Sequence, residues 1–244
     1  VKRQFSDKKL NFLILYVTSN CNFKCKTCFF HNRLHKNDDS DLEEFKKISD
    51  NLGSISILLI AGGEPFLQPN LENICSIFIE KNKVDTIYIP TNGYLTERII
   101  SVTESLLKKF PHITLSINPS LDGMVDYHEQ LRGVKGSFNH AIKTIEKLIL
   151  LKKKYNNLQV IVNSVIHHDN LGDLKKLAVY LRRFNLDYHA FEIMRGDFRD
   201  KSLINADMEE IKDMHEFILK NRQWYLARDL RSNSVFDFLN RIAV

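Results

Sequence analysis

Apolar and amphipathic segments alternate along this chain. Short runs rich in Ile, Leu and Val are followed by longer segments whose apolar residues recur every three or four positions. The short runs predict strands at 10–18, 54–60, 85–90, 112–118, 158–166 and 187–194. The longer segments predict helices near 40–52, 70–82, 96–109, 137–155 and 170–184, with one or two more over 206–241. Such alternation implies parallel strands joined by right-handed crossovers.

Two fold classes accommodate six strand–helix units, namely a partial (β/α)6 TIM-like barrel and an open doubly wound sheet. Along 112–118, apolar residues alternate with polar ones that include Ser116 and Asn118, so one face of the strand is polar. A polar strand face suggests a lumen that holds a ligand, which favours the α/β partial barrel. We therefore expect a barrel core over 1–200 and a helical C-terminal extension over 201–244.

The composition is that of a globular domain with a solvated surface. The 244 residues are 43% hydrophobic and 27% charged, and the formal net charge is +5. Lys and Arg are scattered rather than clustered, so no nucleic-acid partner is expected. No run of about 18 apolar residues occurs, so no membrane span is expected. The basic and then apolar N-terminal segment is interpreted as a strand rather than a signal peptide, and we expect a cytoplasmic location.

Three cysteines lie close together directly after the first predicted strand. Cys21, Cys25 and Cys28 have the spacing CxxxCxxC. A tight, odd-numbered group indicates a metal or cluster site in a reducing compartment rather than a disulfide framework. Three thiolates from one loop can hold a cubane iron–sulfur cluster and leave one iron open. The alternative is a non-catalytic zinc-binding domain in which His31 or His35 is the fourth ligand.

Further short motifs follow at the ends of successive predicted strands. They are AGGEPF at 61–66, TNG at 91–93, SLDG at 120–123, then His128, RG at 132–133 and GSF at 136–138. Together with CxxxCxxC, and in this order over roughly residues 10–195, they resemble the radical S-adenosylmethionine (SAM) superfamily. The pattern is similar to the SPASM-like subgroup that modifies peptides and natural products. Many of its members carry extra cysteines for auxiliary clusters near the C-terminus, and none follow Cys75 in this sequence.

The resemblance implies the cofactors and the chemistry. Cys21, Cys25 and Cys28 would hold a 4Fe-4S cluster whose open iron binds SAM. One electron passed into the sulfonium would release methionine and a 5′-deoxyadenosyl radical, which takes a hydrogen atom from a peptide or natural-product substrate. Because iron–sulfur potentials reach down to about −700 mV, a flavodoxin or ferredoxin donor is implied. A small-metabolite or cofactor-biosynthesis substrate is the alternative, and an oxidoreductase, lyase or transferase outcome stays open.

By the same resemblance, the GGEP and TNG motifs contribute to the SAM site. Gly62 and Gly63 allow the backbone to approach a ligand closely. Backbone carbonyls there, together with Glu64, are expected to accept hydrogen bonds from the SAM ammonium. Asn92 is assigned to the same site.

The adenine contact departs from the family pattern. The residue before the last cysteine is usually aromatic, but here it is Thr27. We expect Phe29 or Phe30 to take over that contact. Met194 ends the last predicted strand, where it would lie against the adenine or in the core.

Polar residues on the strands are the remaining SAM candidates. Ser116 and Asn118 would hold the ribose hydroxyls or satisfy the strand end. Asn163 interrupts an apolar strand, where an unpaired amide costs about 1–3 kcal/mol, so it needs the backbone or SAM as a partner. Arg132 would contact the methionine carboxylate of SAM or pair with an acid in its own loop.

The substrate candidates lie on loops. Tyr94 and His128 are candidate proton or hydrogen donors. Arg195 and Arg199 belong to a charged loop that would bind an anionic substrate or cap the barrel.

Overall fold

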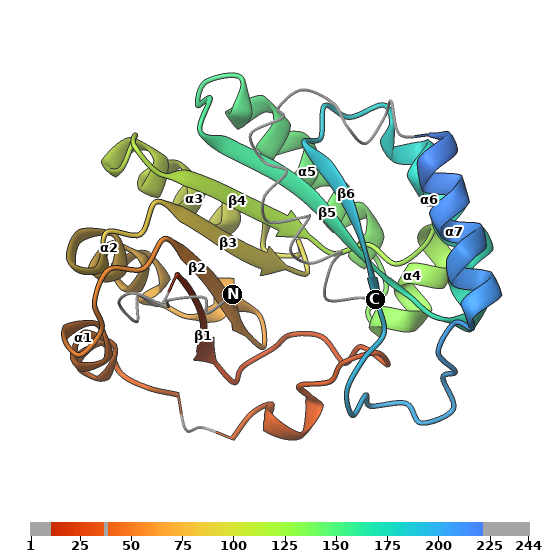
Figure 1. The fold of residues 1–244 in the computed structure, drawn as a ribbon, viewed down its shortest axis with the longest axis horizontal. Helices are drawn as coiled ribbons and strands as arrows, with labels where there is room; N and C mark the ends of the chain where they lie inside the picture. The colour runs from red at the N-terminus through yellow and green to blue at the C-terminus, as the bar shows by residue number, and fades with distance from the viewer. Residues whose placement is uncertain (1–10, 37–38, 222–244) are drawn as a thin grey trace, which may run out of the picture.

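The computed structural model describes residues 11–36 and 39–221. Six parallel strands form one sheet in the order of the sequence, β1-β2-β3-β4-β5-β6 (Figure 1). Their bounds are β1 (Phe12–Thr18), β2 (Ile57–Gly62), β3 (Thr86–Thr91), β4 (Thr114–Pro119), β5 (Leu158–Ile166) and β6 (Tyr188–Ile193). Every predicted strand is present, with its ends shifted by up to three residues at the start of β2.

The helices lie against one face of this sheet (Figure 1). They are α1 (Leu42–Asp50), α2 (Leu71–Asn82), α3 (Thr96–Lys109), α4 (Val125–Arg132), α5 (Ser137–Lys152), α6 (Leu171–Leu181) and α7 (Met208–Lys220). Three 3-10 turns are η1 (His31–Arg33), η2 (Pro65–Leu67) and η3 (His168–Asn170). A doubly wound sheet would rearrange the strand order and cover both faces. The sequential order and the single helical layer confirm the partial (β/α)6 barrel.

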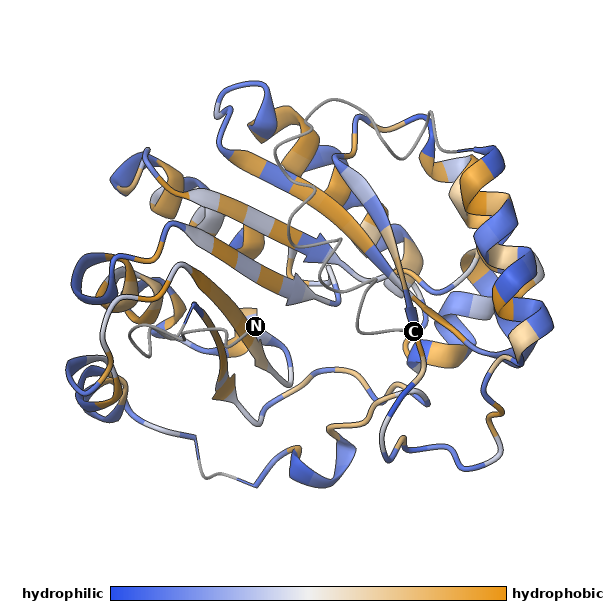
Figure 2. Cartoon of the chain, in the orientation of Figure 1, coloured by the Kyte–Doolittle hydropathy of each residue, from blue (hydrophilic) through white to orange (hydrophobic). Residues whose placement is uncertain are grey.

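Side chains on the helix-facing side of the strands form the core. Leu58, Ile87 and Leu115 are fully buried there in one apolar cluster with the helices. A second cluster joins β5, α6 and α7 through residues such as Leu177 and Met214. In Figure 2 the apolar positions follow the strands and the helix sides that face them, while polar positions lie outward. The described part of the C-terminal segment therefore packs on the same core as α6; the rest of the region where a second helix was predicted lies outside the described residues.

The opposite face of the sheet, here called the inner face, has two different halves. On β1, the alternate residues Phe12, Ile14 and Tyr16 are apolar and exposed. On β4 and β5 the equivalent positions include Ser116 and Asn163. The alternation predicted from the sequence thus places a polar surface next to an apolar one. No helix in the described part of the chain is long and apolar enough to cross a membrane.

Helix α4 was not predicted from the sequence. It is short, and it ends at Gly133, whose φ of 71° is the left-handed conformation that glycine adopts readily. Only His128 and Leu131 are buried on it, so the sequence carries too few apolar positions to show helical periodicity. This helix carries residues of the site described below.

Candidate cofactor site at the cysteine loop

The three predicted ligands lie on one loop, residues 19–30, here called the cysteine loop. Cys21, Cys25 and Cys28 are free thiols of intermediate exposure, whereas Cys75 is buried in α2. Burial raises the pKa of Cys21 to about 12, and the neighbouring Cys25 and Cys28 act in the same direction. Thiols must lose their protons to bind iron, so occupation of this loop by a cluster releases protons.

The GGEP motif holds the start of the cysteine loop. The backbone N–H of Gly63 donates to Thr18 O at 2.9 Å, and that of Glu64 donates to Asn20 O at 2.8 Å. A Cβ on Gly62 would lie 2.4 Å from Thr18 O, and one on Gly63 would lie 2.1 Å from Asn20 O. Both glycines therefore allow a close approach to the protein's own loop. Their contact with SAM stays a prediction.

Glu64 connects the ends of β2 and β3. Its buried carboxylate accepts hydrogen bonds from Phe66 N at 3.2 Å, Thr91 Oγ1 at 2.8 Å and Asn92 N at 2.7 Å. Burial raises the pKa of Glu64 to about 7, against the effect of these donors. The carboxylate thus fixes the TNG motif beside the GGEP motif. An additional contact with the SAM ammonium stays a prediction.

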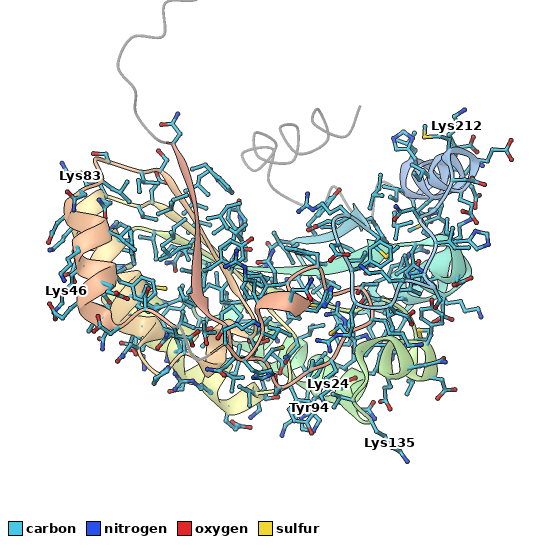
Figure 3. All side chains as sticks on the ribbon, turned by 90° about the horizontal axis from the view of Figure 1, so that it is seen from below. Lys24, Lys46, Lys83, Tyr94, Lys135 and Lys212 are labelled. Carbon is cyan, nitrogen blue, oxygen red and sulfur yellow. The ribbon has the colours of Figure 1, made fainter. Side chains whose placement is uncertain are left out.

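The TNG motif reaches the cysteine loop from the other side. Asn92 Nδ2 donates to Asn22 Oδ1 at 2.7 Å, and its own Oδ1 accepts from Tyr94 N at 3.0 Å. The Tyr94 ring stacks on His140, with 4.0 Å between ring centroids. Figure 3 shows Tyr94 near Lys24 at the margin of the molecule that the helices occupy. Its ring also meets Phe23 of the cysteine loop, with centroids 5.7 Å apart, and a role as a hydrogen donor stays a prediction.

The SLDG motif supplies a buried acid for Arg132. Asp122 Oδ2 accepts from Arg132 Nε at 2.6 Å and lies 2.6 Å from Nη2, while Oδ1 accepts from Val165 N at 2.9 Å. Arg132 Nη1 lies 3.8 Å from Cys25 Sγ. Of the two alternatives for Arg132, the structure shows the pairing with an acid of its own loop. The sequence did not single out Asp122, because its partner is revealed only once α4 folds back.

His128 has no exposed surface, and its Nδ1 accepts from Asp122 N at 3.3 Å. Burial lowers the pKa of His128 to about 3, so the ring is neutral. His128 holds the turn that carries Asp122. A role of His128 as a proton donor to substrate stays a prediction.

Polar groups on the inner face are only partly satisfied by the protein. Ser116 Oγ donates to Asn118 Oδ1 at 2.9 Å, and both residues are buried. Asn163 Nδ2 lies 3.4 Å from Glu192 Oε1, but its buried Oδ1 has no partner among the described residues. This free acceptor suits a ligand that donates hydrogen bonds. Met194 is buried at the end of β6, as either of its predicted roles requires.

The charged loop after β6 returns to the cysteine loop. Arg199 N donates to Cys28 O at 3.1 Å, and Asp200 N donates to Lys26 O at 2.9 Å. Arg195 instead lies 3.7 Å from Glu192 in an exposed pair. The loop therefore contacts the cysteine loop through its backbone, and its two predicted roles, substrate binding and capping of the barrel, stay predictions.

The two aromatic residues after Cys28 have different surroundings. Thr27 is buried, Phe29 is exposed, and a Cβ on Gly196 would lie 3.3 Å from Phe29 Cβ. Phe30 stacks on Tyr16 of β1, with ring centroids 5.1 Å apart. Phe30 thus links the cysteine loop to the inner face. An adenine contact by Phe29 or Phe30 stays a prediction.

The donor set fits a cubane cluster better than a single ion. Within residues 11–36 and 39–221, no group of three or more His, Cys, Asp or Glu side chains is arranged to hold one metal ion. His31 faces Asp197 at 3.8 Å, and His35 is exposed. The fit rests on the chemistry of the donors, because three thiols from one loop are the ligands that an iron–sulfur cluster requires.

Comparison with known proteins agrees with the resemblance drawn from the motifs. The model of the radical SAM superfamily matches residues 15–181. Fe-coproporphyrin III synthase of Methanosarcina barkeri is 26% identical over 223 residues, which are 89% of this chain and 53% of that protein. The subtilosin biosynthesis protein AlbA of Bacillus subtilis is 33% identical over 206 residues, which are 82% of this chain and 44% of AlbA.

The fold is also similar to that of SuiB from Streptococcus suis. With SAM bound, SuiB gives a TM-score of 0.66 at 16% identity, covering 87% of this chain and 48% of SuiB. With its precursor peptide SuiA bound, it gives 0.65 at 17% identity, covering 87% and 46%. The chain thus spans about half the length of the proteins compared here.

A Glu64→Gln variant tests the buried carboxylate. The folded-state pKa of about 7 lies above the ordinary value of 4.5, so the folded protein holds the extra proton between these values. The free energy of unfolding should therefore fall as pH rises from about 4.5 to 7, and Glu64→Gln should flatten this fall. Chemical denaturation at several pH values measures it. Glu80→Gln, at an exposed site, should keep the wild-type slope. Equal slopes in all three proteins would show that Glu64 ionises normally.

Proposed function

The chain belongs to the radical SAM superfamily of enzymes, and from this premise we propose that it cleaves SAM at a 4Fe-4S cluster to modify a peptide. The observation that carries this proposal is the cysteine loop, which carries three partly exposed thiols and is contacted by the GGEP, TNG and RG motifs. Cys21, Cys25 and Cys28 would hold the cluster, which when bound and reduced would supply the electron for cleavage of SAM and so initiate hydrogen abstraction from substrate.

The chain's own residues position these cofactors. Backbone hydrogen bonds from Gly63 and Glu64 fix the loop before Cys21, and the bond from Arg199 fixes it at Cys28. On the inner face, the free Oδ1 of Asn163 can accept from an ammonium or hydroxyl group of SAM. Ser116 and Asn118 offer further polar atoms on the adjacent strand, where ribose hydroxyls are expected.

A Cys25→Ala variant tests the ligand set. It should lose cluster iron and sulfide after anaerobic reconstitution, because a cubane with two protein thiolates is poorly held. It should also form no 5′-deoxyadenosine from SAM and dithionite. Cys75→Ala, in the core, should keep both properties. Cleavage of SAM by Cys25→Ala would refute the assignment.

Two kinds of observation support a peptide substrate. AlbA is named for bacteriocin biosynthesis, and SuiB binds a precursor peptide in its solved structure. Among the described residues, β1 is an edge strand whose inner face is apolar, and Tyr16 on that face is stacked on Phe30 of the cysteine loop. An extended peptide can pair with a free strand edge and place apolar side chains on this surface. A small metabolite is the second candidate substrate, because one relative is named Fe-coproporphyrin III synthase.

An Ile14→Ser variant tests the peptide proposal. Ile14 is 46% exposed on the inner face of β1, so a substrate can cover it. Apolar linear peptides should stimulate 5′-deoxyadenosine formation by the wild-type enzyme. The substitution should raise the peptide concentration needed for half-maximal stimulation roughly tenfold. Val179→Ser, 51% exposed on α6, should have little effect. Stimulation by porphyrins and not by peptides would favour the metabolite.

We further propose an acidic one-electron carrier, such as a flavodoxin or ferredoxin, as the electron donor. Lys24 is exposed within the cysteine loop, and Gly133 packs against it so closely that a Cβ on Gly133 would lie 3.3 Å from Lys24 O. Lys135, two residues later, is also exposed. Neither lysine has an ion-pair partner among the described residues, and Figure 3 places both on the same side. These two lysines place positive charge on the surface, and Lys24 is directly before Cys25 in the sequence.

The double substitution Lys24→Glu and Lys135→Glu tests this surface. SAM cleavage supported by flavodoxin should fall several-fold and its salt dependence should invert, because attraction becomes repulsion that added salt screens. Cleavage supported by dithionite should not change. A matched pair, Lys83→Glu and Lys212→Glu, lies elsewhere on the molecule and should leave both rates unchanged (Figure 3). Equal flavodoxin rates in both double variants would exclude this docking surface.

A further inference from the structure

The guanidinium of Arg132 has an unusual position for a group held by a buried acid. Two of its nitrogens, Nε and Nη2, lie 2.6 Å from one oxygen of Asp122. The third, Nη1, points the other way and lies 3.8 Å from Cys25 Sγ. The planar fork therefore connects a fully buried carboxylate with a thiol that the cluster needs.

Asp122 is itself rigidly fixed. Val165 N donates to Oδ1 at 2.9 Å, and Asn170 Nδ2 donates to the Asp122 carbonyl at 3.2 Å. The backbone N–H of Asp122 is bound by the neutral ring of His128. Because the acid cannot move, the orientation of the Arg132 guanidinium is set by β5 and α4 rather than by solvent.

The end of α4 also contacts the backbone of the cysteine loop. Lys26 N donates to Leu131 O at 2.9 Å, and Gly133 packs against the Lys24 carbonyl. The loop segment that contains Cys25 is thus held on both sides of this residue. Arg132 keeps its distance to Cys25 as long as α4 is in place.

A fixed cation beside a cluster thiolate has an electrostatic consequence. The reduced cluster carries one more negative charge than the oxidised one. A cation or hydrogen-bond donor at a ligand sulfur therefore stabilises the reduced form more, and it does so strongly where little solvent intervenes. The side chain of Arg132 is only 12% exposed, and that of Asp122 is not exposed at all.

We propose that Arg132 is a positioning residue that sets the reduction potential of the cluster through Cys25, and that Asp122 restrains this effect. The Arg132 charge makes the cluster easier to reduce, and the Asp122 charge partly offsets it. This inference rests on the proposed function only in requiring that the cysteine loop holds a cluster; it does not depend on the substrate.

The test is the midpoint potential of the reconstituted cluster, measured without SAM by redox titration followed by electron paramagnetic resonance. Arg132→Gln should shift the midpoint to a more negative value, and Asp122→Asn should shift it to a less negative value. Arg132→Lys keeps the charge and should recover part of the shift. Arg183→Gln, which removes an equivalent charge on a remote surface beside Tyr180, should leave the midpoint unchanged.

Loss of Arg132 alone leaves Asp122 buried without its partner, so this variant can fail to hold a cluster. The comparison of Asp122→Asn with the double variant Asp122→Asn and Arg132→Gln avoids that problem, since no carboxylate is left unpaired. The double variant should have the more negative midpoint of the two. Equal midpoints at equal iron content would overturn the inference, while a wild-type protein that binds no cluster would refute the proposed function instead.

Discussion

The site depends on one constraint, which is that the backbone of the cysteine loop must find hydrogen-bond partners outside itself. A loop that presents three thiols to one cluster cannot also form a helix or a sheet ladder, and unpaired buried backbone groups are costly. Here the partners come from the ends of the neighbouring strands and from α4. Glu64, Leu131 and Arg199 each bind a different point of the loop, and Gly63 binds Thr18 directly before it.

This constraint explains why short motifs recur at successive strand ends. In a parallel barrel, the carboxyl ends of all strands meet at one end of the molecule, which is where ligand sites form. The GGEP glycines pack on Thr18 and Asn20, and Asn92 of the TNG motif binds Asn22. These motifs can serve SAM as well, but their visible partners are in the protein. In such a cofactor site, the motifs at the strand ends bind the loop that carries the cluster ligands.

The sequence was sufficient for the parts of the molecule that depend on local pattern. Strand and helix alternation predicted the barrel, and the cysteine spacing predicted the ligand loop. It was insufficient where a residue's role depends on a distant partner. Asp122 looks like part of a turn until α4 brings Arg132 to it, and His128 looks like a titratable group until its complete burial is known. Helix α4 itself shows no apolar periodicity, because only His128 and Leu131 are buried on it.

The two edges of the barrel are joined through the cysteine loop. Within residues 11–36 and 39–221, the sequential sheet leaves β1 and β6 as edge strands, each paired on one side. The loop after β6 binds the carbonyls of Lys26 and Cys28, so the last ligand is secured by the strand farthest from it in the sequence. Each such bond contributes only about 1 kcal/mol, but without β6 both carbonyls would lose these partners. A substrate that contacts β1 or β6 therefore contacts elements that also hold the cysteine loop. Substrate binding and cofactor binding then depend on the same elements.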